Sequence, residues 1–246
     1  MYVAGIILTF TALGTVPLVI WMYEPATCFD GIQNQGETAI DRSGPCKLLD
    51  PKRLIPHSIM WVRPFISRDG IHSAVAYLEN PNKNAGVKEA AYRMKIYDDN
   101  NVLVEERESV TPIMPGAITP IFEGEMFSGD RVATRAFFEF IAPLTWEKLQ
   151  DRSTNIDIED KLIKDPETDP RVSAIIINND VANFRDLRVV AVVFDQAGNA
   201  FAASQTIIPE FDARAQIPIT FTWSEKFTRR VARVDILPIV PPADIE

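Results

Sequence analysis

The sequence has few of the side chains on which most catalytic and transition-metal sites depend. It contains two histidines and two cysteines in 246 residues. His57 and His72 lie on either side of a predicted strand, and neither has a partner at the spacing of a zinc site or a known catalytic motif. The motifs of P-loop, dinucleotide-binding and zinc-protease folds are also missing. We therefore expect no catalytic residue and predict that the protein is not an enzyme.

Basic charge is also scarce. The chain has 25 Lys and Arg residues against 34 Asp and Glu residues, which gives a formal net charge of −9 and a pI near 4.9. Nucleic-acid binding needs a basic face that contacts phosphates, so we exclude nucleic acid as a partner. The acidity itself identifies no partner, because it mainly keeps a protein soluble.

The first 23 residues have no charged side chain at all. As a helix, such a segment would span the roughly 30 Å hydrocarbon layer of a bilayer. Trp21 and Tyr23 lie at its end, where aromatic residues favour the membrane interface. We predict an uncleaved transmembrane anchor helix over 1–23, in contact with membrane lipid. A cleaved signal peptide and a buried core helix are the alternatives, although no basic segment of the signal-peptide type precedes the apolar run.

The orientation of this anchor is less clearly specified. Arg42, Lys47, Lys52 and Arg53 follow the segment, and counting positive charges would place the C-terminal side in the cytoplasm. Folded domains cross membranes regardless of such counts, and a cysteine pair favours an oxidising exterior. We expect a single-pass protein of the cell membrane whose C-terminal domains are extracytoplasmic, with this conflict open.

Both cysteines fall in an acidic segment, 24–50. Cys28 and Cys46 are 18 positions apart, and a disulfide between them would contribute about 3 kcal/mol by the chain-entropy estimate. Four oxygen-bearing side chains lie between them, without histidine or free thiolate, and this ligand set suits Ca²⁺. A spacer with solvated carboxylates is the alternative. The candidate ligands are Asp30, Asn34, Glu37 and Asp41.

This segment resembles a Cys-rich motif found beside membrane anchors in bacterial surface proteins, roughly C-x-D-G-x-x-N-x-x-E-x-x-x-D-C-G-G-x-C. The chain departs from that motif at Arg42 and Ser43, which replace a cysteine and a glycine. The change removes one possible disulfide and places a cation beside Asp41. Calcium sites of this kind bind at about 10⁻⁴–10⁻³ M.

The remainder of the chain contains an internal repeat. Residues 73–124 align with 173–223, so that Asn80 matches Asn178 and Asp98 matches Asp195. Each copy reads as an apolar strand, an Asn-rich turn, a second strand, a hairpin and further strands. We predict an all-β protein with two tandem immunoglobulin/FnIII-like β-sandwiches, 51–152 and 153–246, following the anchor.

The second strand of the repeat differs between the two copies. Residues 92–96 alternate between apolar and basic side chains, whereas 187–194 are nearly all apolar and are predicted to be buried on both faces. We also expect a short helical turn over 143–150, and partial exposure of both histidines. Phe137 faces away from its apolar neighbours, and we nominate it for a contact between the sandwiches.

The repeat resembles the FxLYD-type and late-embryogenesis-abundant-like β-sandwich domains, although the second copy lacks the Pro-Gly turn. Together with the anchor and the Cys loop, the chain resembles bacterial single-pass membrane proteins that have no assigned activity. The resemblance implies a fold and a location. The matching residues are Asn80, Pro81, Asn82, Tyr97, Asp98, Pro115, Gly116 and Phe122 in the first copy, and Asn178, Asn179, Phe194, Asp195, Gly198 and Phe221 in the second.

These observations lead us to expect a membrane-anchored, extracytoplasmic structural or interaction protein. It would act as a scaffold or assembly component of an envelope complex, with an unknown envelope protein as partner. Strand addition at a sheet edge is the expected mode of contact. The competing class is a carbohydrate- or ligand-binding surface module. Apart from possible Ca²⁺, we expect no cofactor.

Overall fold

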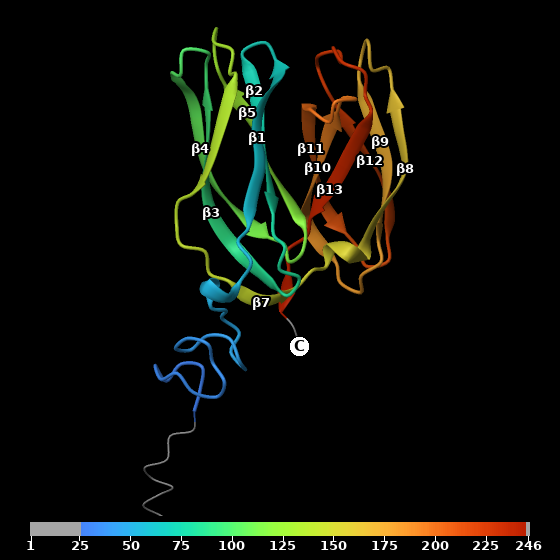
Figure 1. The fold of residues 1–246 in the computed structure, drawn as a ribbon. Coiled ribbons are helices and arrows are strands. Elements are labelled where there is room, and N and C mark those ends of the chain that lie inside the picture. The colour runs from blue at the N-terminus through green and yellow to red at the C-terminus, as the bar shows by residue number, and fades with distance from the viewer. Residues whose placement is uncertain (1–25, 245–246) are drawn as a thin grey trace, which may run out of the picture. The chain divides into compact units, whose positions relative to one another are not determined.

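The computed structural model describes residues 26–244, which fold into strands joined by turns and loops (Figure 1). The chain divides into two compact units that meet between Asp50 and Pro51. Within residues 26–244, no helix has the length and hydrophobicity that a bilayer crossing needs. The anchor predicted over 1–23 lies outside the described residues.

The first unit, described from residue 26, is a loop without extended strands; its one β-bridge joins Ala39 and Arg42. Short backbone hydrogen bonds shape it. The N–H of Glu37 donates to the carbonyl of Asn34 at 2.8 Å, and the N–H of Cys46 donates to the carbonyl of Ser43 at 2.9 Å. Three of its large apolar side chains are exposed, so the loop has no hydrophobic core. These side chains are Phe29, Ile32 and Ile40.

The second unit is all-β and contains four antiparallel sheets, consistent with β-sandwich architecture. We name the sheets A to D. Sheet A contains β1 (Ser58–Arg68), β2 (Ile71–Glu79) and β5 (Ile118–Phe127). Sheet B contains β3 (Ala85–Tyr97), β4 (Leu103–Ile113), β6 (Arg135–Phe140), β7 (Glu147–Gln150) and β14 (Ala243–Asp244). Sheet C contains β10 (Phe184–Phe194), β11 (Ala200–Phe211) and β13 (Arg233–Ile239). Sheet D contains β8 (Ile156–Lys164), β9 (Arg171–Asn178) and β12 (Gln216–Thr222). Two 3₁₀ helices, η1 (Pro51–Arg53) and η2 (Ser153–Asn155), precede β1 and β8.

The two copies of the repeat fold alike. The strand order β1-β2-β5 in sheet A is repeated as β8-β9-β12 in sheet D, and β4-β3-β6 in sheet B is repeated as β11-β10-β13 in sheet C. Equivalent side chains also form equivalent bonds. Asn80 and Asn178 are both buried, and the amide of each donates to backbone carbonyls of neighbouring turns. Asp98 and Asp195 each accept two backbone N–H groups within their hairpins.

Apolar layers separate the sheets, which follow one another in the order B, A, C and D (Figure 1). Between sheets B and A, the buried Tyr92 of β3 donates its hydroxyl hydrogen to Glu123 of β5 at 2.5 Å. Between sheets C and D lies a large cluster that includes Val189 and Phe221. A further cluster joins sheet A to sheet C. Its buried members are Phe65, Val75, Tyr77, Val190, Val192, Phe194, Ala200, Ala203 and Ile239.

The middle strands of sheets A and C are therefore buried on both faces. Val189, Val190 and Val192 are 0% exposed, which confirms the prediction for the apolar run in β10. In β2, Ala74, Val75 and others have no exposed surface either. Strands covered on both faces have continuous apolar sequences, whereas strands with one solvated face alternate.

Two details differ from the sequence-based expectations. Residues 147–150 form β7 rather than a helical turn, because they pair with Ala85 and Gly86 of β3 and, on the other side, with β14. The nearby Trp146 and Leu149 are buried. His72 was expected to be partly exposed, but it is 2% exposed because the loop before β6 covers it; its Nε2 accepts the N–H of Ala133 at 3.1 Å.

Candidate functional site

The loop of residues 26–50 carries the predicted disulfide and the four candidate calcium ligands. Cys28 and Cys46 are joined by a disulfide, as expected, with their Cα atoms 5.4 Å apart. Since the loop has no core, this bond and the hydrogen bonds of polar side chains hold its shape. The arrangement of those side chains determines what the loop can bind.

Asp30 organises the first part of the loop. Its Oδ1 accepts the N–H of Ile32 at 2.8 Å, and its Oδ2 accepts the N–H of Thr27 and the amide of Asn34, both at 2.9 Å. These donors stabilise the charged carboxylate, and the hydrogen bond from Thr27 contributes most to lowering the pKa of Asp30 below its usual value. Asp30 therefore acts as a turn-forming acceptor.

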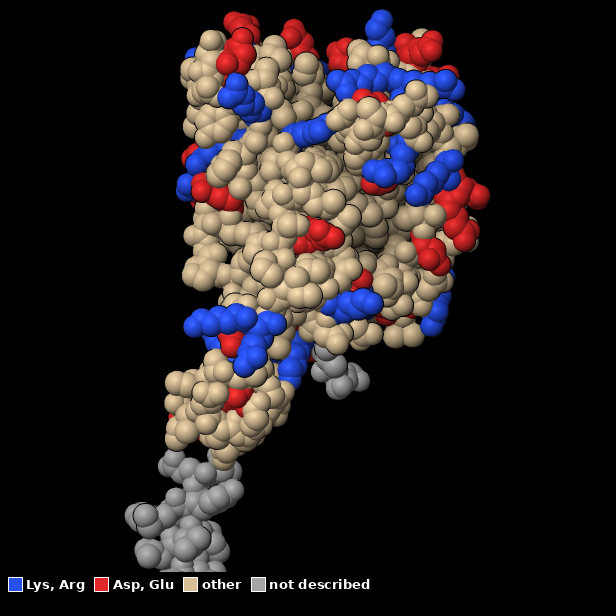
Figure 2. All heavy atoms as spheres, viewed as in Figure 1, with Lys and Arg blue, Asp and Glu red and all other residues tan. Residues whose placement is uncertain are grey.

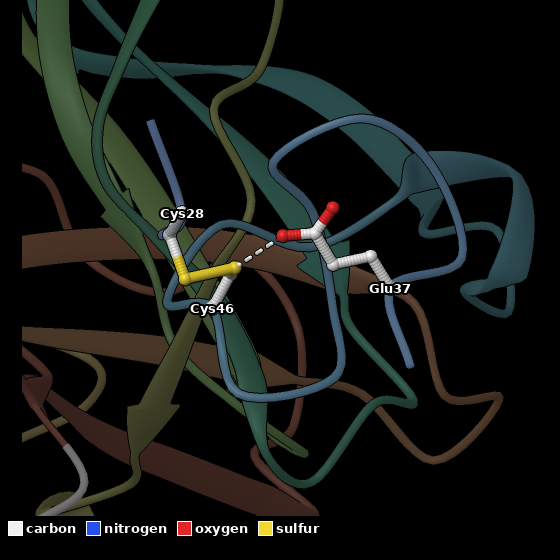
Figure 3. Close-up of side chains that lie close together, drawn as sticks. All are labelled: Cys28, Glu37 and Cys46. Carbon is white, nitrogen blue, oxygen red and sulfur yellow. Dashed lines mark hydrogen bonds between the residues drawn. A yellow bond between two sulfur atoms is a disulfide. The ribbon is translucent and has the colours of Figure 1, made fainter. Parts of the chain in front are cut away.

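Glu37 lies at the centre of the loop and is 7% exposed. Its Oε2 accepts the N–H groups of Asn34 at 3.3 Å and Asp41 at 3.1 Å. Its Oε1 lies 3.0 Å from Sγ of Cys46, and Figure 3 shows the carboxylate pointing toward the disulfide. A disulfide sulfur has no hydrogen to donate, so this contact is packing against the sulfur and not a hydrogen bond from cysteine.

Asp41 closes the loop by accepting the N–H of Gly31 at 3.2 and 3.3 Å. Gly44 allows two turns to meet, because a Cβ at this position would lie 2.9 Å from the backbone of Gly36. The four predicted ligands thus form a chain of hydrogen bonds that runs from Asp30 through Asn34 and Glu37 to Asp41.

The loop's carboxylates are occupied mainly by backbone N–H groups. Within residues 26–244, the one group of three or more His, Cys, Asp or Glu side chains whose ligand atoms lie within 4.8 Å of one another is Cys28, Glu37 and Cys46. The two sulfurs in this group are bonded to each other, so they are not thiolate ligands. One acceptor is left over: Oδ1 of Asn34 is buried and has no hydrogen-bond partner. Calcium binding stays a prediction.

Phe137 lies on β6 and is 49% exposed, with the ammonium of Lys95 6.0 Å from its ring centroid. It does not lie in the cluster between sheets A and C. The contact between the two copies of the repeat is formed by other aromatic residues. Trp61 stacks on Tyr77 with ring centroids 4.2 Å apart, and Phe194 of sheet C lies 6.3 Å from both rings.

Polar bonds reinforce this contact between sheets A and C. The guanidinium of Arg63 in β1 donates to the carbonyl of Ala200 at 3.2 Å and to Oδ1 of Asn199 at 3.3 Å. The sequence signal for the contact was the apolar character of β2 and β10 together. The sequence pattern indicates burial on both faces only for β10, so the sequence does not predict the contact that Trp61 and Tyr77 form.

The histidines fit structural roles. Burial lowers the pKa of both His57 and His72, because desolvation disfavours the charged imidazolium. His57 packs against the aromatic rings of Phe140 and Trp146, with centroid distances of 5.5 and 5.8 Å. The bonding of His72 to a backbone N–H holds the loop before β6.

The comparisons with known proteins add little to this picture. No protein family model and no curated protein sequence matches the chain. Among solved structures, the chain is similar to a beta-glucuronidase from glycoside hydrolase family 2, with 10% sequence identity and a TM-score of 0.25. The match covers 69% of this chain and 24% of the enzyme. At that TM-score, the likeness carries no functional argument.

Proposed function

We propose that the chain is a membrane-anchored, extracytoplasmic structural protein that holds two β-sandwich domains as one rigid body and acts as a scaffold or assembly component of an envelope complex. The proposal combines the uncharged segment 1–23, the disulfide of the loop and the packed body of residues 51–244. Disulfides persist in oxidising surroundings, which supports a location outside the cytoplasm.

The observation that carries the proposal is the apolar layer between sheets A and C. It contains fully buried valines from both sheets, Val75 on one side and Val190 and Val192 on the other. Domains joined only by a linker move relative to each other, whereas a large apolar contact fixes them. A rigid pair of sandwiches can hold partners at a fixed separation, which suits a scaffold.

In the first copy of the repeat, the positions equivalent to the buried valines carry charged side chains, which prevents a further sheet from packing there. By the alignment of the repeat, Val190 and Val192 of β10 correspond to Arg93 and Lys95 of β3. These two basic side chains lie on sheet B and pair with acidic ones: Arg93 with Glu108, and Lys95 with Glu139 at 3.0 Å. A charged outer face does not accept a further apolar sheet, so stacking stops at two copies, as at a capping repeat.

Strand addition, the mode of contact expected from the sequence, is disfavoured by the edges of the sheets. Proline has no backbone N–H, so it interrupts the hydrogen bonds that an incoming strand would form. The middle strands β2, β3, β9 and β10 contain no proline. Six edge strands carry one each: Pro64 in β1, Pro112 in β4, Pro120 in β5, Pro209 in β11, Pro218 in β12 and Pro238 in β13.

Two further edge strands have no proline: β6, which is only six residues long, and β8, which is disrupted in another way. In β8 a register shift lies between Glu159 and Leu162, and Asp160 has a positive φ of 51°. Such bulges turn an edge away from a flat partner strand. A partner would therefore contact sheet faces and loops. Figure 2 shows basic and acidic side chains across one such face, together with uncharged surface.

Phe137 is our candidate for the partner contact. It is a large aromatic side chain on the outer sheet B, and aromatic residues are enriched where protein interfaces bury most of their energy. Crosslinking of membranes that contain the chain should recover one stoichiometric partner. A Phe137→Glu variant should lose this partner, whereas Val181→Glu should retain it, because Val181 is 80% exposed and lies in a turn of the second copy. Recovery of no reproducible partner from wild type would contradict the scaffold role.

Calcium in the loop is a second proposal. Oδ1 of Asn34 is a buried acceptor without a partner, and Oε1 of Glu37 faces only the disulfide sulfur. Both could turn to a hard cation. Calorimetry with Ca²⁺ alone tests this: heat at millimolar concentration that disappears in Asn34→Ala supports it, and no heat at millimolar Ca²⁺ rejects it.

A further inference from the structure

A groove of about 310 Å³ lies between sheets A and C, away from the aromatic contact that joins them. One wall comes from the ends of β1 and β5 and includes Arg68 and Phe122. The other comes from β11 of sheet C and from the last residue of β12 of sheet D with the two residues after it, and includes Gln205 and Trp223. The lining mixes polar side chains such as Ser204 and Gln205 with apolar ones such as Ile71 and Phe122, unlike the apolar cluster between the two sheets.

The aromatic side chains of this groove are held in place. A Cβ on Gly124 would lie 2.9 Å from Cε1 of Phe122, so the ring of Phe122 covers the backbone of this glycine. The indole N–H of Trp223 donates to the carbonyl of Ala203 at 3.0 Å. A substitution at Gly124 would displace the ring of Phe122. The glycine therefore helps to shape the groove.

An exposed phenylalanine lies on the same face of sheet A, next to the residues that line the groove. Phe127 of β5 is the cross-strand partner of Ile71 of β2, and Ile71 lines the groove. Directly paired residues in antiparallel strands project from the same face of a sheet. Phe127 therefore projects from the groove face of sheet A, and it is 61% exposed. Its backbone is fixed, because its N–H donates to the carboxylate of Glu105.

The polar side chains of the groove are electrically balanced. Arg68 and Glu125 contribute one charge of each sign, and the other polar groups are the amide of Gln205 and serine and threonine hydroxyls such as Ser204. Glu125 has a positive φ of 51°, and its carbonyl accepts the guanidinium of Arg107 at 2.8 Å. This environment favours a neutral ligand with many hydroxyl groups over an anion or a cation.

From this combination we infer that the groove binds a neutral saccharide chain. A sugar ring has an apolar face that packs on an aromatic side chain and equatorial hydroxyls that bond to amide and hydroxyl groups, and the groove offers both. An extended peptide fits less well, because the strands that border the groove carry Pro64, Pro120 and Pro209 and resist strand pairing. The inference develops the carbohydrate-binding alternative and needs only that the chain meets polysaccharide outside the cell.

The test uses the full chain in mild detergent and four named probes: the hexasaccharides of cellulose, starch, β-mannan and chitin. Binding is measured by calorimetry. We expect at least one of them to bind, and we expect Phe127→Ala and Gln205→Ala each to weaken that binding at least tenfold. Val181→Ala is the matched control, because Val181 is 80% exposed and does not line the groove, and it should bind like the wild type.

Three outcomes would overturn the inference. One is that none of the four hexasaccharides binds, and another is that binding survives unchanged in both groove variants. The third is that extended peptides bind the chain in a way that depends on Phe127, whereas the saccharides do not. Since Phe127 is exposed, its replacement should leave the thermal unfolding curve in place, and a folded variant makes the binding result interpretable. Partner capture through Phe137 tests the scaffold separately, so the two proposals fail independently.

Discussion

Replacing Phe194 by alanine should destabilise both copies of the repeat, although this residue belongs to the second. Phe194 is 4% exposed, and its ring meets Trp61 and Tyr77 of sheet A. The guanidinium of Arg233 also covers it, with Cζ 4.2 Å from the ring centroid. Truncation of a buried phenylalanine to alanine costs about 3–5 kcal/mol, through lost burial and the cavity left behind.

The expected loss of stability is large enough to measure by urea unfolding. With a urea slope of about 2.5 kcal/mol per molar, the loss corresponds to a midpoint roughly 1–2 M lower. Hydrogen-exchange mass spectrometry at increasing urea reports β3 and β9 separately, because their peptides differ. In residues 51–246, both strands should lose protection at the same urea concentration in the wild type, and both midpoints should fall together in Phe194→Ala.

Phe137→Ala serves as the control for this measurement. Its ring is 49% exposed, so the change should stay within about 0.5 kcal/mol. If Phe194→Ala lowers the midpoint of β9 while β3 keeps its wild-type midpoint, the layer between sheets A and C does not couple the two copies. The rigid-body argument would then be refuted.

Three further predictions concern the buried polar groups and the loop. Asn178→Ala should destabilise residues 51–246 by about 2–3 kcal/mol in urea unfolding. The amide of Asn178 donates to the carbonyls of Ala182 and Asp212, and the substitution would leave both without that donor. A loss of stability below about 0.5 kcal/mol would contradict this role. Burial lowers the pKa of His72 in the folded state below its ordinary value of 6.5, so the unfolded state binds the proton more tightly. The free energy of unfolding should therefore be highest above about pH 6.5 and should decline as the pH falls below it. His72→Gln should weaken this decline, with the rest contributed by His57, and an unchanged pH profile of stability would contradict the role of His72. Cys46→Ser should make the loop of residues 26–50 sensitive to limited proteolysis. The urea midpoint of residues 51–246 should stay the same, because the loop is a separate compact unit. A lowered midpoint for residues 51–246 would show that the stabilities of the two units are coupled.

Features set by local sequence were predictable. The apolar run in β10 predicted burial on both faces, and the adjacent Val189 and Val190, which point to opposite faces, have no exposed surface. The spacing of Cys28 and Cys46, as the only cysteines, predicted their disulfide. The matched Asn80 and Asn178 predicted two similarly folded copies of the repeat, because a buried amide that bonds several turn carbonyls is specific to one turn geometry.

Features that depend on distant segments were not predictable. Residues 147–150 have a composition that suits a helix, but pairing with β3 and with the remote β14 makes them a strand. The sequence predicts a partly exposed His72, and only the return of the chain at Ala133 buries it. The groove shares this property, because Arg68, Phe122 and Gln205 line it together only through the stacking of two sheets and have no common motif.

The topology of the chain in the cell tests the central claim most directly. In intact cells that produce the full chain, a protease added outside should remove residues 51–246, the chain should sediment with membranes, and Cys28 and Cys46 should react with a thiol reagent only after reduction. A soluble chain that the protease does not reach, with both thiols labelled without reduction, would contradict the proposed membrane-anchored scaffold.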